Sequence, residues 1–202
     1  MENLKSLFAL LAVLLVFTLS ANATNYSIDT KSSKLKWKGE KVVGKHFGTV
    51  EIKNGSVTLD NNKMTGNFDI DMTSIVSEDL KDNKDSHGKL VGHLKSDDFF
   101  SVDKHPTAKF TLKKADKYSP EKGQDYNYMV TGDLTIKGIT NEVRFPAKIN
   151  MSGNNFNAYA SFTIDRTKWN VKYKSGSIFD GLGDAAIYDD IKFELHLNGK
   201  SN

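Results

Sequence analysis

Strict alternation of apolar and polar residues restricts the fold of this chain more than any other feature. In the run Lys34-Leu35-Lys36-Trp37-Lys38, apolar side chains occupy every second position between lysines. A period of two is the pattern of a β-strand that buries one face and exposes the other. Runs with this period lie at residues 34–38, 49–53, 56–60, 67–72, 108–113, 130–137, 142–149, 156–165 and 191–198. The chain is therefore predicted to be all-β.

Short turn-forming segments separate several of these runs, so neighbouring strands are expected to be antiparallel. The segments are Asn54-Gly55, Asn61-Asn62, Gly138 to Asn141 and Gly153-Asn154-Asn155, and each has the composition of a tight turn. A long meander with one apolar face leaves that face in water unless the sheet closes into a barrel or folds into a sandwich.

One segment between the strands is predicted to be a short helix. Ser86 is a suitable N-cap, Leu90, Val91 and Leu94 share one face, and Pro106 prevents a return to helix before the next strand. Such a helix could cover one end of a barrel.

Residues 1–23 are predicted to be a secretory signal peptide that is removed on export. Lys5 precedes an apolar run from Leu7 to Leu19, and Ala21-Asn22-Ala23 has the small-x-small pattern that a signal peptidase accepts. The run is shorter than the roughly 20 residues needed to cross a bilayer, so the chain is not expected to span a membrane. Residues 24–202 are expected to form one exported domain.

Composition and motifs argue against several classes of function. There is no cysteine, which excludes disulfides and thiol catalysis. The net charge of +3 comes from lysines that alternate with acids along the predicted strands, so nucleic-acid binding is not expected. His87 and His93 lack the i, i+4 spacing of a zinc pair, and the chain has no serine-hydrolase or nucleotide-binding motif. We therefore predict no catalytic residue, no metal site and no cofactor.

Four ordered segments resemble the YceI-like family of bacterial periplasmic proteins. They are His93 to Thr111, Gly132 to Thr140, Thr163 to Val171 and Gly183 to Leu197. The resemblance implies a periplasmic, antiparallel, lipocalin-like β-barrel of about eight strands. It also implies a ligand with a long apolar chain, such as a polyisoprenoid, an isoprenoid quinone, or a fatty acid or amide. At Trp169, members of the family commonly carry phenylalanine.

Large aromatic residues, mostly at inward-facing positions, are the candidates to line a ligand cavity. They are Trp37, Phe47, Phe68, Phe110, Phe145, Phe162, Trp169 and Phe193. At the opening, Arg166, Lys168 and Lys172 could meet an anionic head group, or they could simply be solvated. The alternation alone is equally compatible with side chains that fill the barrel, because small closed barrels occur in both forms.

Three functions therefore remain open from the sequence. The first is a periplasmic protein that binds or carries a long-chain isoprenoid or fatty lipid. The second is a structural or stress-related secreted barrel without a ligand. The third is an enzyme acting on isoprenoid lipids, for which no polar constellation can be assembled from these residues. An exposed edge strand could support a homodimer, although the sequence identifies no such edge.

Overall fold

The computed structural model describes residues 23–201, which form one antiparallel sheet of nine strands. The strands are β1 (Thr24–Ile28), β2 (Lys34–Lys41), β3 (Lys45–Asp60), β4 (Lys63–Ser77), β5 (Thr107–Lys117), β6 (Tyr128–Ile136), β7 (Ile139–Ser152), β8 (Asn155–Asp165) and β9 (Ile187–Ser201). One α-helix, α1 (Lys84–Lys95), and two 3-10 helices, η1 (Arg166–Trp169) and η2 (Gly183–Ala185), complete the secondary structure of these residues. The all-β fold class predicted from the alternation is confirmed.

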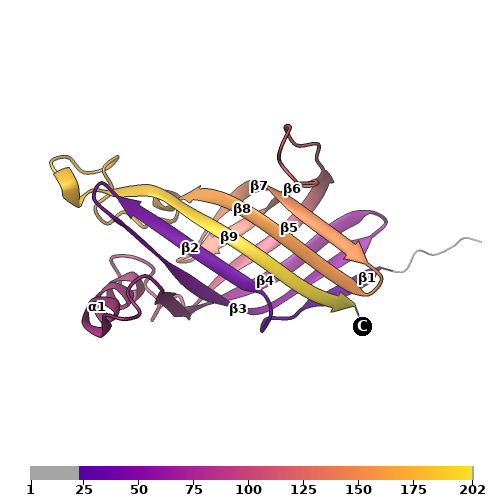
Figure 1. Cartoon of the computed structure of the whole chain (residues 1–202), viewed down its shortest axis with the longest axis horizontal. Coiled ribbons are helices and arrows are strands. Elements are labelled where there is room, and N and C mark those ends of the chain that lie inside the picture. The colour runs from indigo at the N-terminus through magenta and orange to yellow at the C-terminus, as the bar shows by residue number, and fades with distance from the viewer. Residues whose placement is uncertain (1–22, 202) are drawn as a thin grey trace, which may run out of the picture.

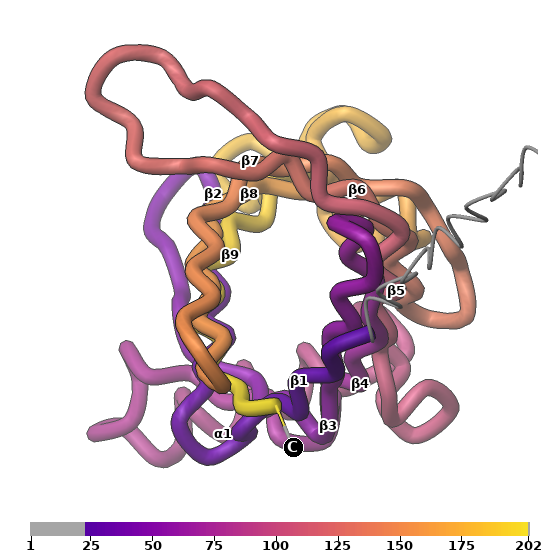
Figure 2. The backbone as a smooth tube through the Cα atoms, turned by 90° about the vertical axis from the view of Figure 1, so that its right-hand side faces the viewer, coloured from indigo at the N-terminus to yellow at the C-terminus, as the bar shows by residue number. Residues whose placement is uncertain are grey.

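The sheet closes on itself because β3 pairs with β4 as well as with β2. β1 and β2 share one place between β3 and β9: Tyr26 lies opposite Val57 and Ser201, and Trp37 lies opposite Gly48 and Phe193. The nine strands therefore make the predicted eight-position barrel, which is a closed ring when viewed along its axis (Figure 2). Each strand of the described residues is paired on both sides over part of its length, so these strands do not provide the free edge considered for a homodimer.

β3 runs without a break through Asn54-Gly55, so the turn predicted there is wrong. Its register against β4 shifts by one residue between Ile52 and Asn54, which makes Lys53 the extra residue of a β-bulge and reverses the inward-facing side chains after it. A Cβ atom on Gly55 would lie 2.7 Å from the Phe68 ring, so the glycine serves close packing. The next predicted turn is confirmed, with Asn61 and Asn62 at φ 46° and 66°.

The predicted helix is present but begins earlier than expected. The Asn83 side chain caps α1 by accepting a hydrogen bond from the Ser86 amide at 3.0 Å, so Ser86 is inside the helix and is not its N-cap. Leu94 is buried, whereas Leu90 and Val91 remain partly exposed. The helix lies at one end of the barrel, on the left in Figure 1.

The two ends of the barrel differ in what surrounds them. We call the end with α1 and the segment from η1 to η2 the helix end, and the end with the β3–β4, β5–β6 and β7–β8 connections the closed end (Figure 1). At the closed end, Tyr26, Val57, Met64 and Phe156 are at most 4% exposed, and the rings of Tyr26 and Phe156 are 5.6 Å apart. These side chains seal the interior at that end.

The predicted signal peptide, residues 1–23, lies almost entirely outside the described residues. Within residues 23–201, no helix has the length and apolar character needed to cross a bilayer.

Candidate ligand-binding cavity

The interior of the barrel is hollow. The cavity has a volume of about 1560 Å³, counting the part that is open to solvent. No polar atom contributes to the surface of the cavity. The structure therefore supports the hollow form of the barrel over the filled one.

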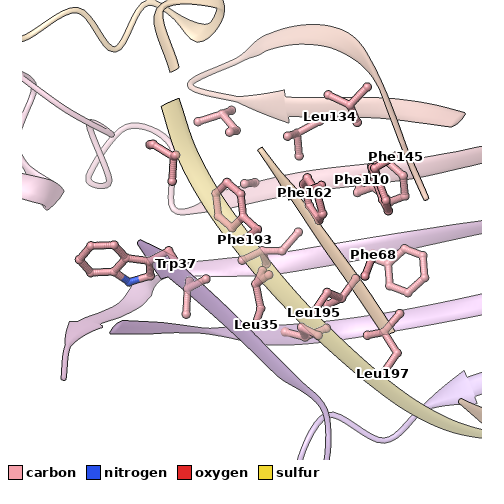
Figure 3. Close-up of a pocket in the computed structure, with 18 of the residues that line it drawn as sticks. Leu35, Trp37, Phe68, Phe110, Leu134, Phe145, Phe162, Phe193, Leu195 and Leu197 are labelled. Carbon is pink, nitrogen blue, oxygen red and sulfur yellow. The ribbon is translucent and has the colours of Figure 1, made fainter. Parts of the chain in front are cut away.

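A row of aromatic side chains runs around the cavity wall, and we call it the aromatic girdle. Its members are Phe68 on β4, Phe110 on β5, Phe145 on β7, Phe162 on β8, Phe193 on β9 and Trp37 on β2. Ring centroids are 6.1 Å apart for Phe68 and Phe110, 5.9 Å for Phe110 and Phe145, 4.1 Å for Phe145 and Phe162, and 5.5 Å for Phe162 and Phe193. Trp37 continues the row as the register partner of Phe193. Figure 3 shows these side chains inside the barrel.

Small residues beside the girdle set the shape of the space. Gly132 on β6 lies under the Phe110 ring, and a Cβ atom on this residue would be only 2.5 Å from the ring. Because Gly132 has no side chain, Phe110 can reach across β6 to Phe145. Ala147 and Ala160 face one another on β7 and β8 and also line the cavity. Short side chains at these positions leave room that larger ones would fill.

The cavity reaches the surface at the helix end, through an opening that we call the mouth. Gly39, Ile187 and Tyr188 line the cavity there, and Tyr188 is also 51% exposed. The register between β2 and β9 is irregular at this point: Gly39 pairs with Ile191 and Lys41 with Ile187, which leaves Tyr188 to Asp190 opposite Glu40 alone. The resulting bulge separates the two strands at the mouth.

Arg166 holds the backbone of this bulge in place. Its guanidinium donates hydrogen bonds to the carbonyls of Tyr188 at 3.1 Å, Ile187 at 3.1 Å and Val171 at 2.8 Å, and lies 3.3 Å from Asp189. The residue is 2% exposed. Burial lowers the pKa of Arg166, and the negative charges of Asp189 and Asp165 oppose that shift.

Of the three predicted head-group residues, only Arg166 lines the cavity, at the mouth. The nitrogens of Arg166 are already used by carbonyl groups and Asp189, so this side chain is not free to bind an anionic ligand. Lys168 and Lys172 are exposed and do not line the cavity. The sequence could not reveal this arrangement, because two of the three carbonyls that Arg166 binds, those of Ile187 and Tyr188, lie at an irregularity of β9 that no sequence pattern marks.

Two of the predicted wall residues lie elsewhere. Phe47 pairs with Lys38, points outward and is 39% exposed, because inward positions on this part of β3 are its neighbours Gly48 and Val50. Trp169 is on η1, is 1% exposed, and donates from its indole Nε1 to the Leu134 carbonyl at 2.9 Å. It packs among the core residues of the helix end without lining the cavity. The other six predicted residues line it.

Polar groups near the helix end have structural partners. Asp79 accepts hydrogen bonds from the Phe47 amide at 3.0 Å and the Ser77 hydroxyl at 2.7 Å, and is 2.8 Å from the His46 ring. Burial would raise the pKa of Asp79, but these interactions outweigh it and lower the pKa. His93 packs between the rings of Phe99 and Tyr173. Within residues 23–201, no group of acidic and histidine side chains is arranged to hold a metal ion.

One member of the girdle carries an unusual polar group. The indole Nε1 of Trp37 is buried and has no hydrogen-bond acceptor among the described residues. Buried donors normally have partners, because an unpaired one keeps its desolvation cost.

A family model and several relatives match this chain. The family model of the YceI-like domain matches residues 26–199. A UPF0312 protein of Photorhabdus laumondii is 32% identical over 152 residues, which is 72% of this chain and 72% of the relative. Alignments with two further UPF0312 proteins cover 55% and 49% of those relatives.

Two solved structures have the same fold. Burkholderia cenocepacia BcnA superposes with a TM-score of 0.64 at 23% identity, covering 85% of this chain and 98% of that one. A polyisoprenoid binding domain from Saccharophagus degradans, described as implicated in plant cell wall breakdown, superposes with a TM-score of 0.62 at 13% identity, covering 88% and 98%. At these identities the likeness shows the fold alone.

Proposed function

This chain belongs to the YceI-like domain family, and from that membership and the cavity we propose that it binds one long apolar lipid chain inside the barrel. The observation that carries the proposal is the cavity wall, which is apolar throughout and encloses about 1560 Å³ counting the part open to solvent. Such a wall offers a hydrocarbon chain dispersion contacts and offers no partner to a charged group. The structural neighbour that is a polyisoprenoid binding domain supports the same class of ligand.

The energetics favour a long chain over a short one. Each buried CH₂ contributes about 0.8 kcal/mol, so ten carbons contribute roughly 8 kcal/mol. Association costs roughly 4–15 kcal/mol in lost freedom. Shorter chains would therefore bind weakly, and affinity should rise with chain length until the cavity is full.

The proposed cellular role is that of a carrier or store. If residues 1–23 direct export, the protein meets its ligand in the periplasm, where an isoprenoid or fatty chain needs shielding from water. Among the described residues, the cavity lining includes no carboxylate, histidine, serine or lysine side chain, and its one charged residue, Arg166, is already bound to backbone carbonyls and Asp189, so we propose binding and not turnover.

The test is to extract the purified protein under denaturing conditions and search for a bound lipid by mass spectrometry. We expect one apolar chain per barrel, and a delipidated sample should take up polyprenols or fatty amides with affinity that increases with length. Absence of any extracted lipid, together with no uptake of added chains, would refute the proposal.

A matched pair of substitutions makes the test specific to the cavity. Ala160→Phe adds a ring to the wall, whereas Ser161→Phe adds the same ring on the exposed side of the same strand. Ala160→Phe should reduce uptake of long chains at least tenfold, and Ser161→Phe should leave it within about twofold. Unfolding curves of both variants would show that each is folded.

A further inference from the structure

The exposed apolar side chains of this barrel are all at one end. The large hydrophobic residues that are more than a third exposed among residues 23–201 are Val42, Val43, Phe47, Val76, Ile139, Ile178, Phe179 and Tyr188. Each lies at the helix end, in a turn, a loop or the end of a strand. At the closed end, the β3–β4 turn consists of Asn61-Asn62 and the β7–β8 turn of Gly153-Asn154. A random scatter of surface hydrophobics would need no explanation, but this segregation does.

Five of these side chains lie on the side of the barrel where the mouth opens, and we call them the apolar rim. They are Val42 and Val43 in the β2–β3 turn, Ile178 and Phe179 in the loop between η1 and η2, and Tyr188 on β9. The first of these segments, the β2–β3 turn, lies beside the residue that follows η2, because the Val42 amide donates to the Ala186 carbonyl at 3.1 Å (Figure 1, left). The second loop is fixed at its base by a bond of 2.8 Å from the Ile187 amide to the Lys174 carbonyl.

The rim is continuous with the cavity. Tyr188 belongs to both, and Gly39 beside it leaves open space, because a Cβ built there meets no atom within 4 Å. A lipid entering the barrel at the mouth would pass between exposed apolar side chains. Such a path would let the chain avoid exposure to water during transfer.

The charges around the rim indicate what it meets. Val42 and Val43 lie between the exposed lysines Lys41 and Lys45, and Lys172 and Lys174 lie in the first part of the second loop. Two exposed acids, Asp180 and Asp184, follow Phe179, and Asp190 is exposed two residues after Tyr188, whereas Asp189 is paired with Arg166 and Glu40 with Lys38 and Lys192. Four lysines against Asp180, Asp184 and Asp190 leave an excess of one positive charge around the rim. Apolar tips flanked by lysines match the interface of a bilayer, where hydrocarbon lies beneath anionic head groups.

We propose that the helix end of this protein docks on an anionic lipid bilayer through the apolar rim, with the mouth facing the membrane. A protein partner or a second copy would favour a single flat patch, whereas the rim projects from separate loops at the mouth of a lipid cavity. The role of docking in lipid exchange rests on the proposed function, but attachment to the bilayer can be measured without it.

The experiment is co-sedimentation of the purified protein with vesicles of phosphatidylethanolamine and phosphatidylglycerol. We expect Val43→Ser combined with Phe179→Ser to lower vesicle partitioning about tenfold or more, because each side chain buries apolar area in the bilayer. These residues are 60% and 48% exposed, so the variant should unfold at the same urea concentration as the parent protein. Vesicles without phosphatidylglycerol should bind the parent protein less tightly.

Ile139→Ser is the matched control, because Ile139 is 37% exposed at the same end but lies at the start of β7, outside the rim. It should change partitioning by less than about twofold. The proposal is overturned if the parent protein does not bind vesicles, if the rim variant binds as the parent does, or if Ile139→Ser loses as much binding. It is also overturned if light scattering shows a dimer that the rim variant dissociates.

The cavity variant separates the two proposals. Ala160→Phe should lose uptake of added lipid from detergent and keep its vesicle binding, whereas the rim variant should show the reverse. A parent protein that sediments with vesicles but never takes up a lipid would refute the proposed function and leave docking standing.

Discussion

The two ends of the barrel are built from the same strands, yet they close in different ways. The closed end is sealed by interlocking apolar side chains such as Val57, Met64 and Phe156, which are at most 2% exposed. The helix end is assembled from α1, the 3-10 helices and a strand bulge, and is held partly by the buried Arg166. Apolar packing closes one end of the barrel. At the other end the strand pairing is irregular, and backbone carbonyls that lose their strand partners need polar side chains to bind them.

This difference has an energetic consequence. At the closed end, side chains such as Phe156 are almost fully buried even where they border the cavity, so their loss removes many dispersion contacts. Around the girdle, one side of each ring faces empty space, so fewer contacts are lost. Girdle residues that are only partly buried should therefore contribute less to stability than fully buried residues such as Phe156 at the closed end and Trp169 at the helix end.

The largest effect on stability is expected for Arg166, the buried charged residue of the helix end. Arg166→Met would leave Asp189 and the carbonyls of Val171, Ile187 and Tyr188 without their partner, at a cost of about 3–5 kcal/mol. Urea unfolding would measure it. Lys168→Met, two residues away and exposed, should stay within about 0.5 kcal/mol of the parent protein. Equal stability of the two variants would show that Arg166 does not hold the bulge.

A second pair of substitutions compares the closed end with the girdle directly. Phe156→Ala should destabilise the protein by about 3–5 kcal/mol, because the ring is 2% exposed. Phe193→Ala should cost less than about 2 kcal/mol in delipidated protein, because Phe193 is only partly buried, whereas Phe156 is almost fully buried although both line the cavity. Unfolding free energies that agree within error would contradict the contrast between packed and hollow regions.

The two tryptophans provide a finer comparison within the helix end. Trp169→Phe removes the hydrogen bond to the Leu134 carbonyl and should cost about 0.5–1.5 kcal/mol. Trp37→Phe removes a buried donor that has no acceptor, so it should be neutral or stabilising. Thermal unfolding of both variants would check this, and a larger loss for Trp37→Phe would mean that its indole has a partner such as water.

The smallest effect concerns acid pH and the connection that leads to α1. The pKa of Asp79 is lowered in the folded protein, so its contribution is fully present above the unfolded pKa of about 3.9 and is lost as the pH falls through the folded value. Asp79→Asn should therefore reduce stability near neutral pH and flatten its dependence between roughly pH 5 and pH 3. A pH profile parallel to that of the parent protein would contradict this role.

Much of the barrel was predictable, because alternation sets which side chains face inward. Alternation identifies the six aromatic residues of the girdle. It also indicates that Phe47 faces outward, because the inward-facing residues Val50 and Ile52 are at even-numbered positions and Phe47 is at an odd-numbered one. The reversal of parity between Ile52 and Val57 was the signal of the bulge at Lys53. In the sequence this bulge looks like a turn, because both interrupt the alternation of apolar and polar residues.

What the sequence did not predict depends on contacts between distant segments. The burial of Trp169 and Arg166 follows from partners on β6 and β9 that local patterns do not reveal. The position of the mouth likewise depends on the irregular register between β2 and β9. Whether the interior was filled could not be decided from residue types, because a narrow space depends on strand arrangement as well as side-chain size.

The pairing of Tyr26 with Ser201 places the first and last strands side by side at the closed end. A short linker could therefore join them outside the barrel, and the chain could be opened instead in the loop between η1 and η2. Such a circular permutant would carry its new termini beside the mouth, where a fused reporter could register the arrival of a lipid.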